Sequence, residues 1–510
     1  MRTSALQRLY LQKPISSVII TCAIALLPWL GNNFHTEDEA REASVAALIL
    51  ESGNWILPKT VSGEFVSTPP MPHWLMAIFS LPQGHISEFT SRLPSAIAQI
   101  VLIGFVLVFF GKRIRFQEAF IATLLLLTCF IIHRAGMTAH PDMLFATFTV
   151  LGLMQLYRWE NKLELKGLPV IIPLLFSCAI LTKGITGILL PLFIFFVYLL
   201  TLHKCSFLKT IKALLYMGIS SMFIPTIWYV AAYNQGGADF LSITLSENFG
   251  YPFLLSQGSI DGAGYGKDVL YNLGTLLSGF IPWTLLFIFS LFGAKWRMPG
   301  KSFRQIMNDG WSWFLSVEKV KRFSIVAAVC IIFIYTILPS KRSIYILSAY
   351  PFLSILLAQY FIYITENRSK VTRIFAYVLT TIVSVAFVAG ILIMTHAVDF
   401  NAIIAGYTAN VSILHLIESI TNTFASNHVM SWIIMVFLLI SIITVIYQTT
   451  KRINIKILYA TILMTFCLNL FIDGIVMKGV GHESSPPIVK QQAGYNPETN
   501  KNPVQLLFTD

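Results

Sequence analysis

The sequence predicts an all-α polytopic membrane protein, and composition and apolar segment length lead to this fold class. Of 510 residues, 55% are hydrophobic and only 12% are charged, and the mean hydropathy is +0.71. Soluble domains carry about 25% charged residues, so most of this chain is expected to contact lipid or other spans. A membrane span needs about 20 mostly apolar residues, and about 13 stretches approach this length. They lie near 15–30, 93–110, 117–133, 142–157, 168–182, 187–202, 211–232, 269–293, 323–338, 344–364, 371–396, 429–448 and 453–473.

The distribution of charge predicts how the spans are oriented. With a cytoplasmic N-terminus and alternating spans, 25 of the 36 Lys and Arg residues fall in cytoplasmic segments, and 18 of the 24 acidic residues fall outside. Basic residues concentrate on the cytoplasmic side of membrane proteins. The net charge of +12 therefore reflects topology and anionic lipid, and nucleic acid is not an expected partner. We expect a multi-pass protein of the inner (plasma) membrane whose C-terminus is periplasmic or extracellular.

The chain is expected to form one transmembrane domain, residues 1–474, followed by a short outer tail, residues 475–510. Four loops are long enough to carry function: 31–92, 233–268 and 397–428 on the outer side, and 294–322 on the cytoplasmic side. All six cysteines lie in spans or at a cytoplasmic edge, so neither a disulfide framework nor a cysteine metal site is expected.

The first outer loop, residues 31–92, is predicted to contain two helices. Thr36 followed by Glu39 has the pattern of a capping box, which opens a helix that ends at Ser52-Gly53. Alanines at three-to-four spacing suit a helix that lies in the membrane interface. A second helix, from His73 to Leu81, begins after two prolines and carries an interfacial Trp74.

Two acidic residues are candidates for catalysis. Asp38 lies in the first turn of the predicted helix, where the helix dipole favours its charged form. Asp142 lies at the outer mouth of a span. Acids in a first turn are common and Asp142 also suits a helix cap, so both structural interpretations stay open. Carboxylates at the edge of the membrane are nevertheless functional candidates, and these two could flank one cavity.

Four outer cations are candidates for binding a lipid phosphate. Lys183, Lys341 and Arg342 end spans on the outer side, against the general charge asymmetry, and Arg41 lies in the first loop. Charge-assisted hydrogen bonds to a phosphate would explain them. Snorkelling of the side chains to lipid headgroups explains them equally well at this point.

The second outer loop contains Glu247, which belongs to a polar cluster of low specificity. The outer histidines lack the spacing of metal ligands, so no metal site is predicted. A divalent cation stays open as the one cofactor to consider, and no other is expected.

The combined motifs resemble those of a bacterial glycosyltransferase superfamily, the lipid A aminoarabinose transferases and the protein O-mannosyltransferases. The resemblance covers about residues 30–365, and the motifs occur in the same order. They are Asp38-Glu39-Ala40-Arg41, Ser52-Gly53-Asn54-Trp55, Pro69-Pro70 with Trp74, Glu88-Phe89 with Arg92-Leu93-Pro94, Pro141-Asp142-Met143, Leu181-Thr182-Lys183-Gly184, Ile281-Pro282-Trp283, and Ser340-Lys341 with Tyr345.

This resemblance implies a GT-C fold, a bundle of about a dozen spans with interfacial helices in the first outer loop. It implies transfer of a sugar, with inversion, from a polyprenyl-phosphate carrier to a glycolipid, polysaccharide or protein on the outer face. By the resemblance, Asp38 is the catalytic-loop carboxylate and Asp142 a second outer acid. Arg41 matches a family arginine, and Lys341 and Tyr345 match contacts to the carrier phosphate.

The chain departs from the family pattern at Thr68, where relatives carry a lysine that binds the carrier phosphate. Either Lys183, Lys341 or Arg342 supplies that charge, or the carrier is held differently, or the activity is altered. The short outer tail also disfavours lipid A in particular as the acceptor. A flippase for lipid-linked sugars and a catalytically altered family member are the alternative functions. A transporter usually places charges near the membrane midplane, whereas the ionisable residues here are predicted at span ends.

Overall fold

The computed structural model describes most of the chain between residues 5 and 478. The residues left undescribed within that range are 61–62, 64, 67, 161–162, 164–168, 203–206, 247–270, 293–301, 339–341, 396–417, 420 and 423–427. Lys341, Glu247 and most of the predicted tail, 475–510, therefore lie outside the described residues, and so does most of the predicted outer loop 397–428.

The described chain is α-helical, with one isolated antiparallel bridge between Lys59 and Phe65. The predicted all-α fold class is confirmed. In chain order the helices are α1 (Ala5–Leu26), η1 (Leu27–Trp29), α2 (Glu37–Ser52), α3 (Met71–Ser80), α4 (Glu88–Gly111), α5 (Phe116–Thr128), α6 (Phe130–Gly136), α7 (Pro141–Trp159), α8 (Ile171–Lys183), α9 (Thr186–Thr201), α10 (Phe207–Leu245), α12 (Tyr271–Gly279), α13 (Trp283–Leu291), α14 (Phe303–Ser316), α15 (Lys319–Ile337), η4 (Ser343–Ala349), α16 (Tyr350–Asn367), α17 (Ser369–Met394), α20 (His428–Lys451), α21 (Asn454–Phe471) and η5 (Ile472–Met477).

Each predicted apolar stretch contains a helix, but the number of full spans is lower than thirteen. Among the described residues, seven helices are long and apolar enough to cross a membrane, or nine if two bent pairs each count as one span. Three further apolar helices, Pro14–Trp29, α8 and α9, are shorter. The chain is therefore a multi-pass membrane protein, and the count of thirteen spans is not confirmed, because several predicted stretches are short or bent.

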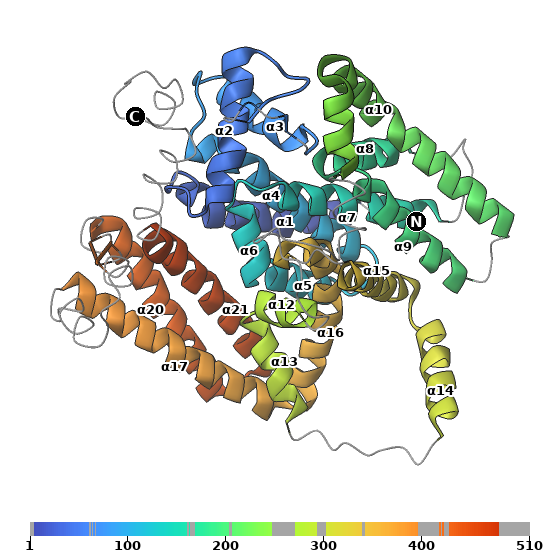
Figure 1. Ribbon diagram of the computed structural model, residues 1–510. Helices are drawn as coiled ribbons and strands as arrows, with labels where there is room; N and C mark the ends of the chain where they lie inside the picture. The colour runs from blue at the N-terminus through green and yellow to red at the C-terminus, as the bar shows by residue number, and fades with distance from the viewer. Residues whose placement is uncertain are drawn as a thin grey trace.

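The helices form a central bundle with a peripheral group at its side (Figure 1). In the centre, α4 packs against α5 and α7, while α16 packs against α5 and α15. In Figure 1, α17, α20 and α21 form a separate orange and red group, and these three helices pack on one another. At the top of the view, α2 and α3 lie over α4, and α3 contacts α4 directly.

Two bent helix pairs meet at their breaks in the middle of the bundle. The pair α5 and α6 bends by 65°, and the pair α12 and α13 bends by 109°. At the breaks, the amide of Phe130 donates to the carbonyl of Ile281 at 3.2 Å, and Trp283 Nε1 donates to Thr128 Oγ1 at 3.1 Å. A backbone group that is left unpaired in a membrane costs several kcal/mol. The hydrogen bonds between the two breaks therefore stabilise both bends. Pro282 is a local signal for the second bend, because proline cannot continue a helix, whereas no glycine or proline marks the first bend.

The first loop contains both predicted helices. Thr36 caps α2, accepting a hydrogen bond from the Glu39 amide at 3.4 Å, and Gly53 ends the helix with a positive φ of 68°. The capping box is only half formed, because the Glu39 carboxylate accepts from the His35 amide instead of from the Thr36 amide. The second helix, α3, begins directly after Pro69-Pro70, as predicted.

The alanine face of α2 packs against protein. Ala43, Ala46 and Ala47 are buried in one cluster with Met76 of α3 and with Ala139. Small side chains let two helices approach closely, which is why this face fits against α3. The expectation that the alanines rest on the membrane interface is therefore corrected.

Two predicted loops contain helix. The segment 233–245, assigned to the second outer loop, continues α10, which reverses at Gly237 with φ of 58°. After the reversal, the Phe240 ring packs 5.9 Å from the Trp228 ring, so the apolar stretch that follows Gly237 folds back on its own helix. The segment 294–322, predicted as a cytoplasmic loop, contains α14, which stands apart from the bundle (Figure 1).

Candidate active site

The first turn of α2 places two adjacent carboxylates in opposite environments. Successive residues of a helix point about 100° apart, so Asp38 and Glu39 leave the helix in different directions. The Asp38 side chain is 43% exposed, whereas the Glu39 side chain is completely buried. One acid therefore faces the surface and the other faces the core.

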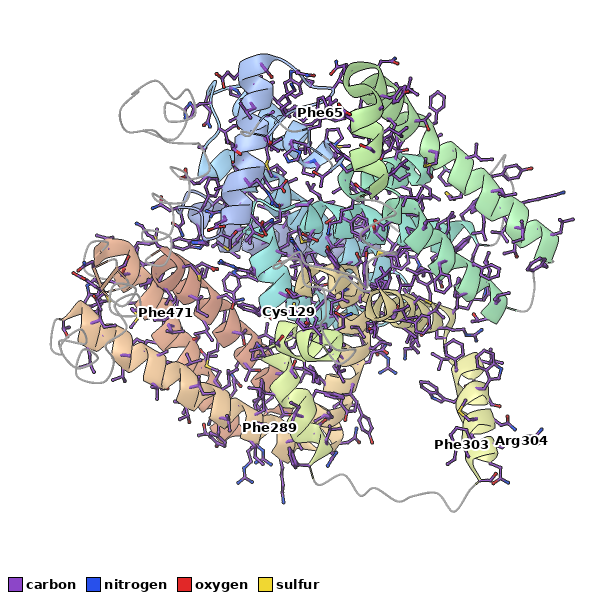
Figure 2. The ribbon with its side chains drawn as sticks, in the orientation of Figure 1. Phe65, Cys129, Phe289, Phe303, Arg304 and Phe471 are labelled. Carbon is purple, nitrogen blue, oxygen red and sulfur yellow. The ribbon has the colours of Figure 1, made fainter. Side chains whose placement is uncertain are left out.

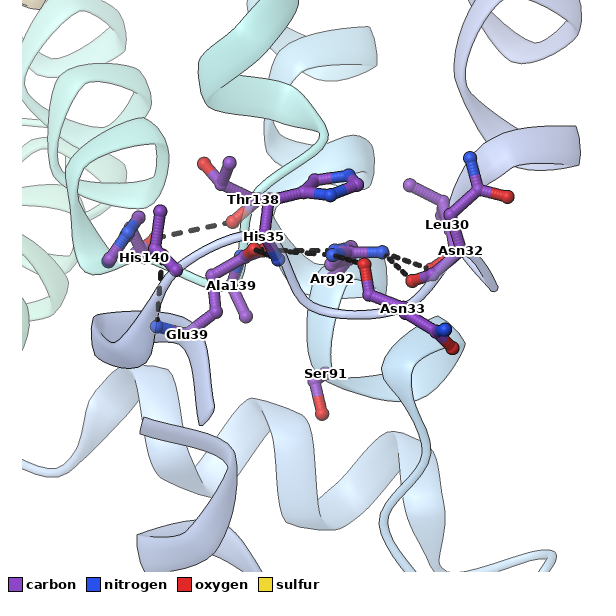
Figure 3. Close-up of polar contacts among 12 residues, drawn as sticks. Leu30, Asn32, Asn33, His35, Glu39, Ser91, Arg92, Thr138, Ala139 and His140 are labelled. Carbon is purple, nitrogen blue, oxygen red and sulfur yellow. Dashed lines mark hydrogen bonds and ion pairs between the residues drawn. The ribbon is translucent and has the colours of Figure 1, made fainter. Parts of the chain in front are cut away.

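Glu39 forms a buried ion pair with Arg92 of α4 (Figure 3). Arg92 Nε donates to Glu39 Oε1 at 2.9 Å, and Nη2 donates to Oε2 at 3.2 Å. The remaining guanidinium hydrogens reach the carbonyls of Leu30, Asn32 and Asn33. A planar guanidinium suits this bidentate geometry.

Two backbone amides complete the shell around Glu39. The His35 amide donates to Oε2 at 3.0 Å, and the Ala139 amide donates to Oε1 at 2.9 Å. We use the term strap for the Glu39–Arg92 ion pair. Through its hydrogen bonds, it joins residues 30–39, α4 and the segment that leads into α7. It fixes the start of α2 relative to the start of α7, and these two starts carry Asp38 and Asp142.

The charges of the strap shift the pKa values of Glu39 and His35. Burial raises the pKa of Glu39, but the Arg92 guanidinium and the hydrogen bonds to the carboxylate outweigh burial and lower that pKa to about 2. Burial, assisted by Arg92 and Arg134, lowers the pKa of the His35 ring to about 3. At neutral pH Glu39 is therefore a carboxylate and His35 is neutral.

Asp38 belongs to a half-exposed cluster with two cations. Its Oδ1 lies 3.1 Å from Arg41 Nη2, and its Oδ2 lies 3.7 Å from Arg342 Nη1. Arg41 is one helical turn further along α2, while Arg342 directly precedes the short helix η4. The carboxylate thus lies between two guanidinium groups that come from distant parts of the chain.

Asp142 forms a second pair with Lys183, and this pair is more deeply placed. The α7 N-terminus and the α8 C-terminus lie at one mouth because these packed helices run in opposite directions. Lys183 Nζ donates to Asp142 Oδ1, and the two side chains are 19% and 7% exposed. The helix dipoles favour this arrangement, with an acid in a first turn and a cation in a last turn.

Neither residue has the structural role considered from the sequence. His140 occupies the N-cap position of α7, so Asp142 is not the cap. Lys183 is turned toward protein and does not snorkel to the surface. The turn that allows this needs Gly184, whose φ is 68° and ψ −152°, and Gly187, where a Cβ would lie 2.4 Å from the Ala179 carbonyl carbon.

The helix η4 links the two clusters. Lys183 Nζ lies 4.6 Å from the centroid of the Tyr345 ring, a distance typical of a cation–π contact. Tyr345 is three residues after Arg342, and its amide donates to the Arg342 carbonyl at 3.1 Å. We use the term charged arc for Asp38, Arg41, Arg342, Tyr345, Lys183 and Asp142.

The charged arc thus contains six of the eight residues predicted for the site. Lys341 and Glu247, the other two, lie outside the described residues. Thr68 is exposed. Among the described residues, no group of three or more His, Cys, Asp or Glu side chains is arranged to hold a metal ion, and the divalent cation stays an open question.

No local pattern predicted the pairing that supports the arc. Glu39 was predicted as part of a cap and of a family motif, and Arg92 only as part of a family motif. An arginine directly before an apolar span was the available hint, because a cation there needs a partner. A third pair, Glu42 with His73 at 2.8 Å, joins α2 to α3 beneath Arg41 and was also unforeseen.

Comparison with known proteins gives this geometry a family context. Residues 67–229 match the family model described as dolichyl-phosphate-mannose-protein mannosyltransferase. An undecaprenyl phosphate-alpha-4-amino-4-deoxy-L-arabinose arabinosyl transferase of Shewanella sediminis is 23% identical over 357 residues, which is 68% of this chain and 60% of that protein. An uncharacterized protein of Aquifex aeolicus is 26% identical over 71% of this chain and 64% of its own length.

A solved structure has a fold similar to that of this chain. The crystal structure of ArnT from Cupriavidus metallidurans bound to undecaprenyl phosphate superposes with a TM-score of 0.65 at 17% identity, covering 95% of this chain and 80% of that one. The chain therefore has the GT-C fold, and its sequence is similar to those of the aminoarabinose and protein mannosyl transferases.

This GT-C protein matches less than two thirds of its first curated relatives. A second arabinosyl transferase, from Proteus mirabilis, is 24% identical over 48% of this chain and 44% of its own length. The comparisons therefore show the GT-C fold, while the substrates of this chain have to be argued from its own residues.

Proposed function

We propose that this protein transfers a sugar from a polyprenyl-phosphate carrier to an acceptor hydroxyl on the outer face of the membrane, with inversion at the anomeric carbon. The observation that carries the proposal is the charged arc. It combines a half-exposed carboxylate, Asp38, with three cations at one mouth of the bundle. Such a mouth can hold a lipid phosphate and an acceptor hydroxyl side by side.

The chemistry of the donor explains why cations dominate the arc. In the transfer step the acceptor oxygen forms a bond to the anomeric carbon, and the bond between that carbon and the phosphate oxygen breaks. The electron pair leaves with the phosphate, which becomes a more highly charged anion. Preorganised cations aimed at developing charge lower the barrier, and no general acid is needed for such a leaving group.

Lys183 is the best-placed cation for the carrier phosphate. Its ammonium group lies between the Asp142 carboxylate and the Tyr345 ring, which hold it at the mouth of the bundle. An ammonium group can turn a hydrogen toward an incoming phosphate without losing these neighbours, because it has three donors. This charge substitutes for the cation that relatives carry at the position of Thr68.

Asp38 is the carboxylate for the acceptor. It is accessible, and the acceptor proton has to leave as the new bond forms. A carboxylate within hydrogen-bond reach can accept that proton or orient the hydroxyl. Arg41 and Arg342 hold Asp38 in place and can also face the phosphate. Asp142 acts indirectly, as a positioning residue for Lys183.

An apolar groove between α9 and α10 offers a place for the carrier tail. It is lined by residues that include Leu192, Leu214, Gly218 and Phe223. The helix α9, which supplies Leu192, begins three residues after Lys183 and so connects the groove to the cation. An isoprenoid chain gains free energy by burial against such side chains.

The expected location is the inner (plasma) membrane, with the N-terminus cytoplasmic and the C-terminus outside. Its partners are then the lipid-linked donor, membrane lipids, and a glycolipid, polysaccharide or protein acceptor. The observation that favours transfer over flipping is the position of the charges, because Asp38, Asp142, Lys183 and Arg342 all lie at helix ends on one mouth.

The test uses purified protein in vesicles supplied with radiolabelled polyprenyl-phosphate sugars and an outer-envelope extract. Transfer predicts that label moves from the carrier to an acceptor, and that Asp38→Asn abolishes this movement. Carrier that crosses the vesicle membrane with its sugar attached would instead establish a flippase. Label that stays on the carrier in the wild type, with no movement, would indicate a catalytically altered family member.

A further inference from the structure

Helix α14 exposes most of an apolar face outside the bundle, and only Phe314 of that face packs against the core. None of its residues is buried, and the Phe303 ring is 80% exposed. Figure 2 shows Phe303 and Arg304 at the end of α14 that lies far from the other helices. An exposed apolar face of this size usually marks a surface that another phase or molecule covers.

Six of the seven apolar side chains of α14 gather on one side of the helix. At 100° per residue, these six occupy a continuous arc of the helical wheel that is more than a third of the circle, and the uncharged polar residues occupy the opposite side. The six are Phe303, Ile306, Met307, Trp311, Trp313 and Phe314, the polar set is Gln305, Asn308, Ser312 and Ser316, and Leu315 lies at the border between the two sides. This is the pattern of a helix that lies between an apolar medium and water.

The C-terminal end of α14 is tied to the ends of two apolar helices. Arg322 of α15 donates to the carbonyls of Leu315 and Val317, and also to the carbonyl of Thr201 at 3.2 Å. Thr201 is the last residue of α9, and α15 begins at Lys319. The end of α14 therefore lies at the membrane boundary and cannot move far from it.

The bundle also shows on which side of the membrane this boundary lies. Lys319 Nζ lies 3.6 Å from Glu160 Oε1, directly after the end of α7. The other end of α7 carries Asp142. A helix of this length spans about 28 Å at 1.5 Å per residue. Helix α14 consequently lies on the side opposite the charged arc.

We propose that α14 lies flat in the interface of the lipid bilayer on that side, with its apolar face toward the acyl chains. Only Val317 and Glu318 lie between Ser316 and the first residue of the span α15. Three Cα–Cα steps reach about 11 Å at most, so the helix has to stay near the bilayer. Trp311 and Trp313 suit headgroup depth. Arg304 and Lys321 add positive charge beside the helix, and anionic headgroups attract such charge.

The test places single nitroxide labels on the full-length protein in nanodiscs of phosphatidylcholine and phosphatidylglycerol. Labels at Met307→Cys and Trp311→Cys report the apolar face, and labels at Asn308→Cys and Ser312→Cys report the polar face. Signal from protein without an introduced cysteine is subtracted. A label at Val329→Cys, on an exposed position of the span α15, gives the reference for acyl-chain depth.

Power saturation then compares oxygen, which partitions into lipid, with a water-soluble nickel chelate. The proposal predicts that the two apolar positions favour oxygen several-fold more than the two polar positions do. Equal access of the nickel chelate to all four positions would overturn the proposal. It would instead mean that the apolar face is exposed to water and is a binding surface for a protein. The result does not depend on transferase activity, so it is separate from the proposed function.

Discussion

The two acids at the start of α2 are neighbours in the sequence and opposites in the structure. Glu39 is enclosed by Arg92 and two backbone amides, and every contact it makes joins one part of the chain to another. Asp38 is half-exposed and lies between two guanidinium groups at the mouth of the bundle. Two consecutive residues of one helical turn therefore supply a structural carboxylate and the carboxylate that we propose for the reaction.

This difference explains how a half-exposed site can be well ordered. The strap holds the starts of α2 and α7 together from beneath, so Asp38 and Asp142 keep their relative places without contacting each other. The strap should thus control folding, whereas the charged arc should control chemistry. The predictions below separate these two effects.

The largest expected effect is on stability, from breaking the strap. Replacing Arg92 by Ala leaves the Glu39 carboxylate buried without a countercharge, which costs about 3–5 kcal/mol. We expect a strongly lowered Tm in detergent, measured by differential scanning fluorimetry. Arg92→Lys should not restore the Tm, because an ammonium group cannot reproduce the bidentate contact. Exposed Glu37, replaced by Gln, is the matched control, and a similar loss there would contradict the assignment.

The next effect is on catalysis, from removing the deeper cation of the arc. Lys183→Ala should lower kcat/KM for the carrier by about 10²–10³-fold, the range seen when one preorganised donor to a developing anion is removed. Asp142→Asn should lower it less, because Asp142 acts through Lys183.

A double-mutant cycle sharpens this prediction. Adding Asp142→Asn to Lys183→Ala should change kcat/KM little, since groups that act together are not additive. Fully additive losses would show that Asp142 contacts the reacting groups independently, and the positioning role would be wrong.

A smaller effect, on the KM for the carrier, is expected from replacing the exposed cation Arg342. Arg342→Ala should raise the KM for the carrier by about two- to fivefold, because an exposed ion pair contributes roughly 0.2–1 kcal/mol. Arg342→Lys keeps the charge and should stay near the wild-type KM. Lys341→Ala should raise the same KM by the family resemblance, and an unchanged value would remove Lys341 from the phosphate site.

The pH dependence of stability should distinguish the contribution of His35 from that of Glu39. The pKa of His35 falls from 6.5 to about 3 on folding, so the unfolded chain binds a proton that the folded chain does not, and stability declines as pH falls below 6.5. The pKa of Glu39 falls from 4.5 to about 2, so its stabilisation is complete above pH 4.5 and is lost between 4.5 and 2.

The Tm of two variants, measured from pH 7 to pH 3.5, tests these windows. His35→Gln should flatten the decline between pH 6.5 and 4.5, while Glu39→Gln should start from a lower Tm and flatten the decline only below 4.5. Identical slopes for wild type and His35→Gln above pH 4.5 would show that His35 does not titrate with folding.

The sequence predicted those features that depend on local pattern. Every stretch predicted from apolar length contains a helix, and Thr36 and Gly53 marked both ends of α2, because caps and spans are encoded within a few residues. Family order placed Asp38, Asp142, Lys183 and Tyr345 in one site before any contact was known. Exposure and pairing of these residues were not predicted.

Features that depend on distant contacts were missed. Glu39 and Arg92 are 53 residues apart in the chain, and no local sequence pattern at either residue indicates its partner. The bend at Phe130 occurs within apolar sequence, where the carbonyl of Ile281 in the opposite break accepts the hydrogen bond of the Phe130 amide. The interfacial role assigned to the alanines of α2 failed because small residues serve helix packing and interface contact equally well.

The most direct test of the account measures activity and Tm on the same preparations of Asp38→Asn and Glu39→Gln. Asp38→Asn is expected to keep the wild-type Tm and to lose transfer of label from carrier to acceptor, and Glu39→Gln is expected to lower the Tm. The account would be contradicted if Asp38→Asn transferred sugar at the wild-type rate, because the exposed carboxylate would then have no part in the reaction.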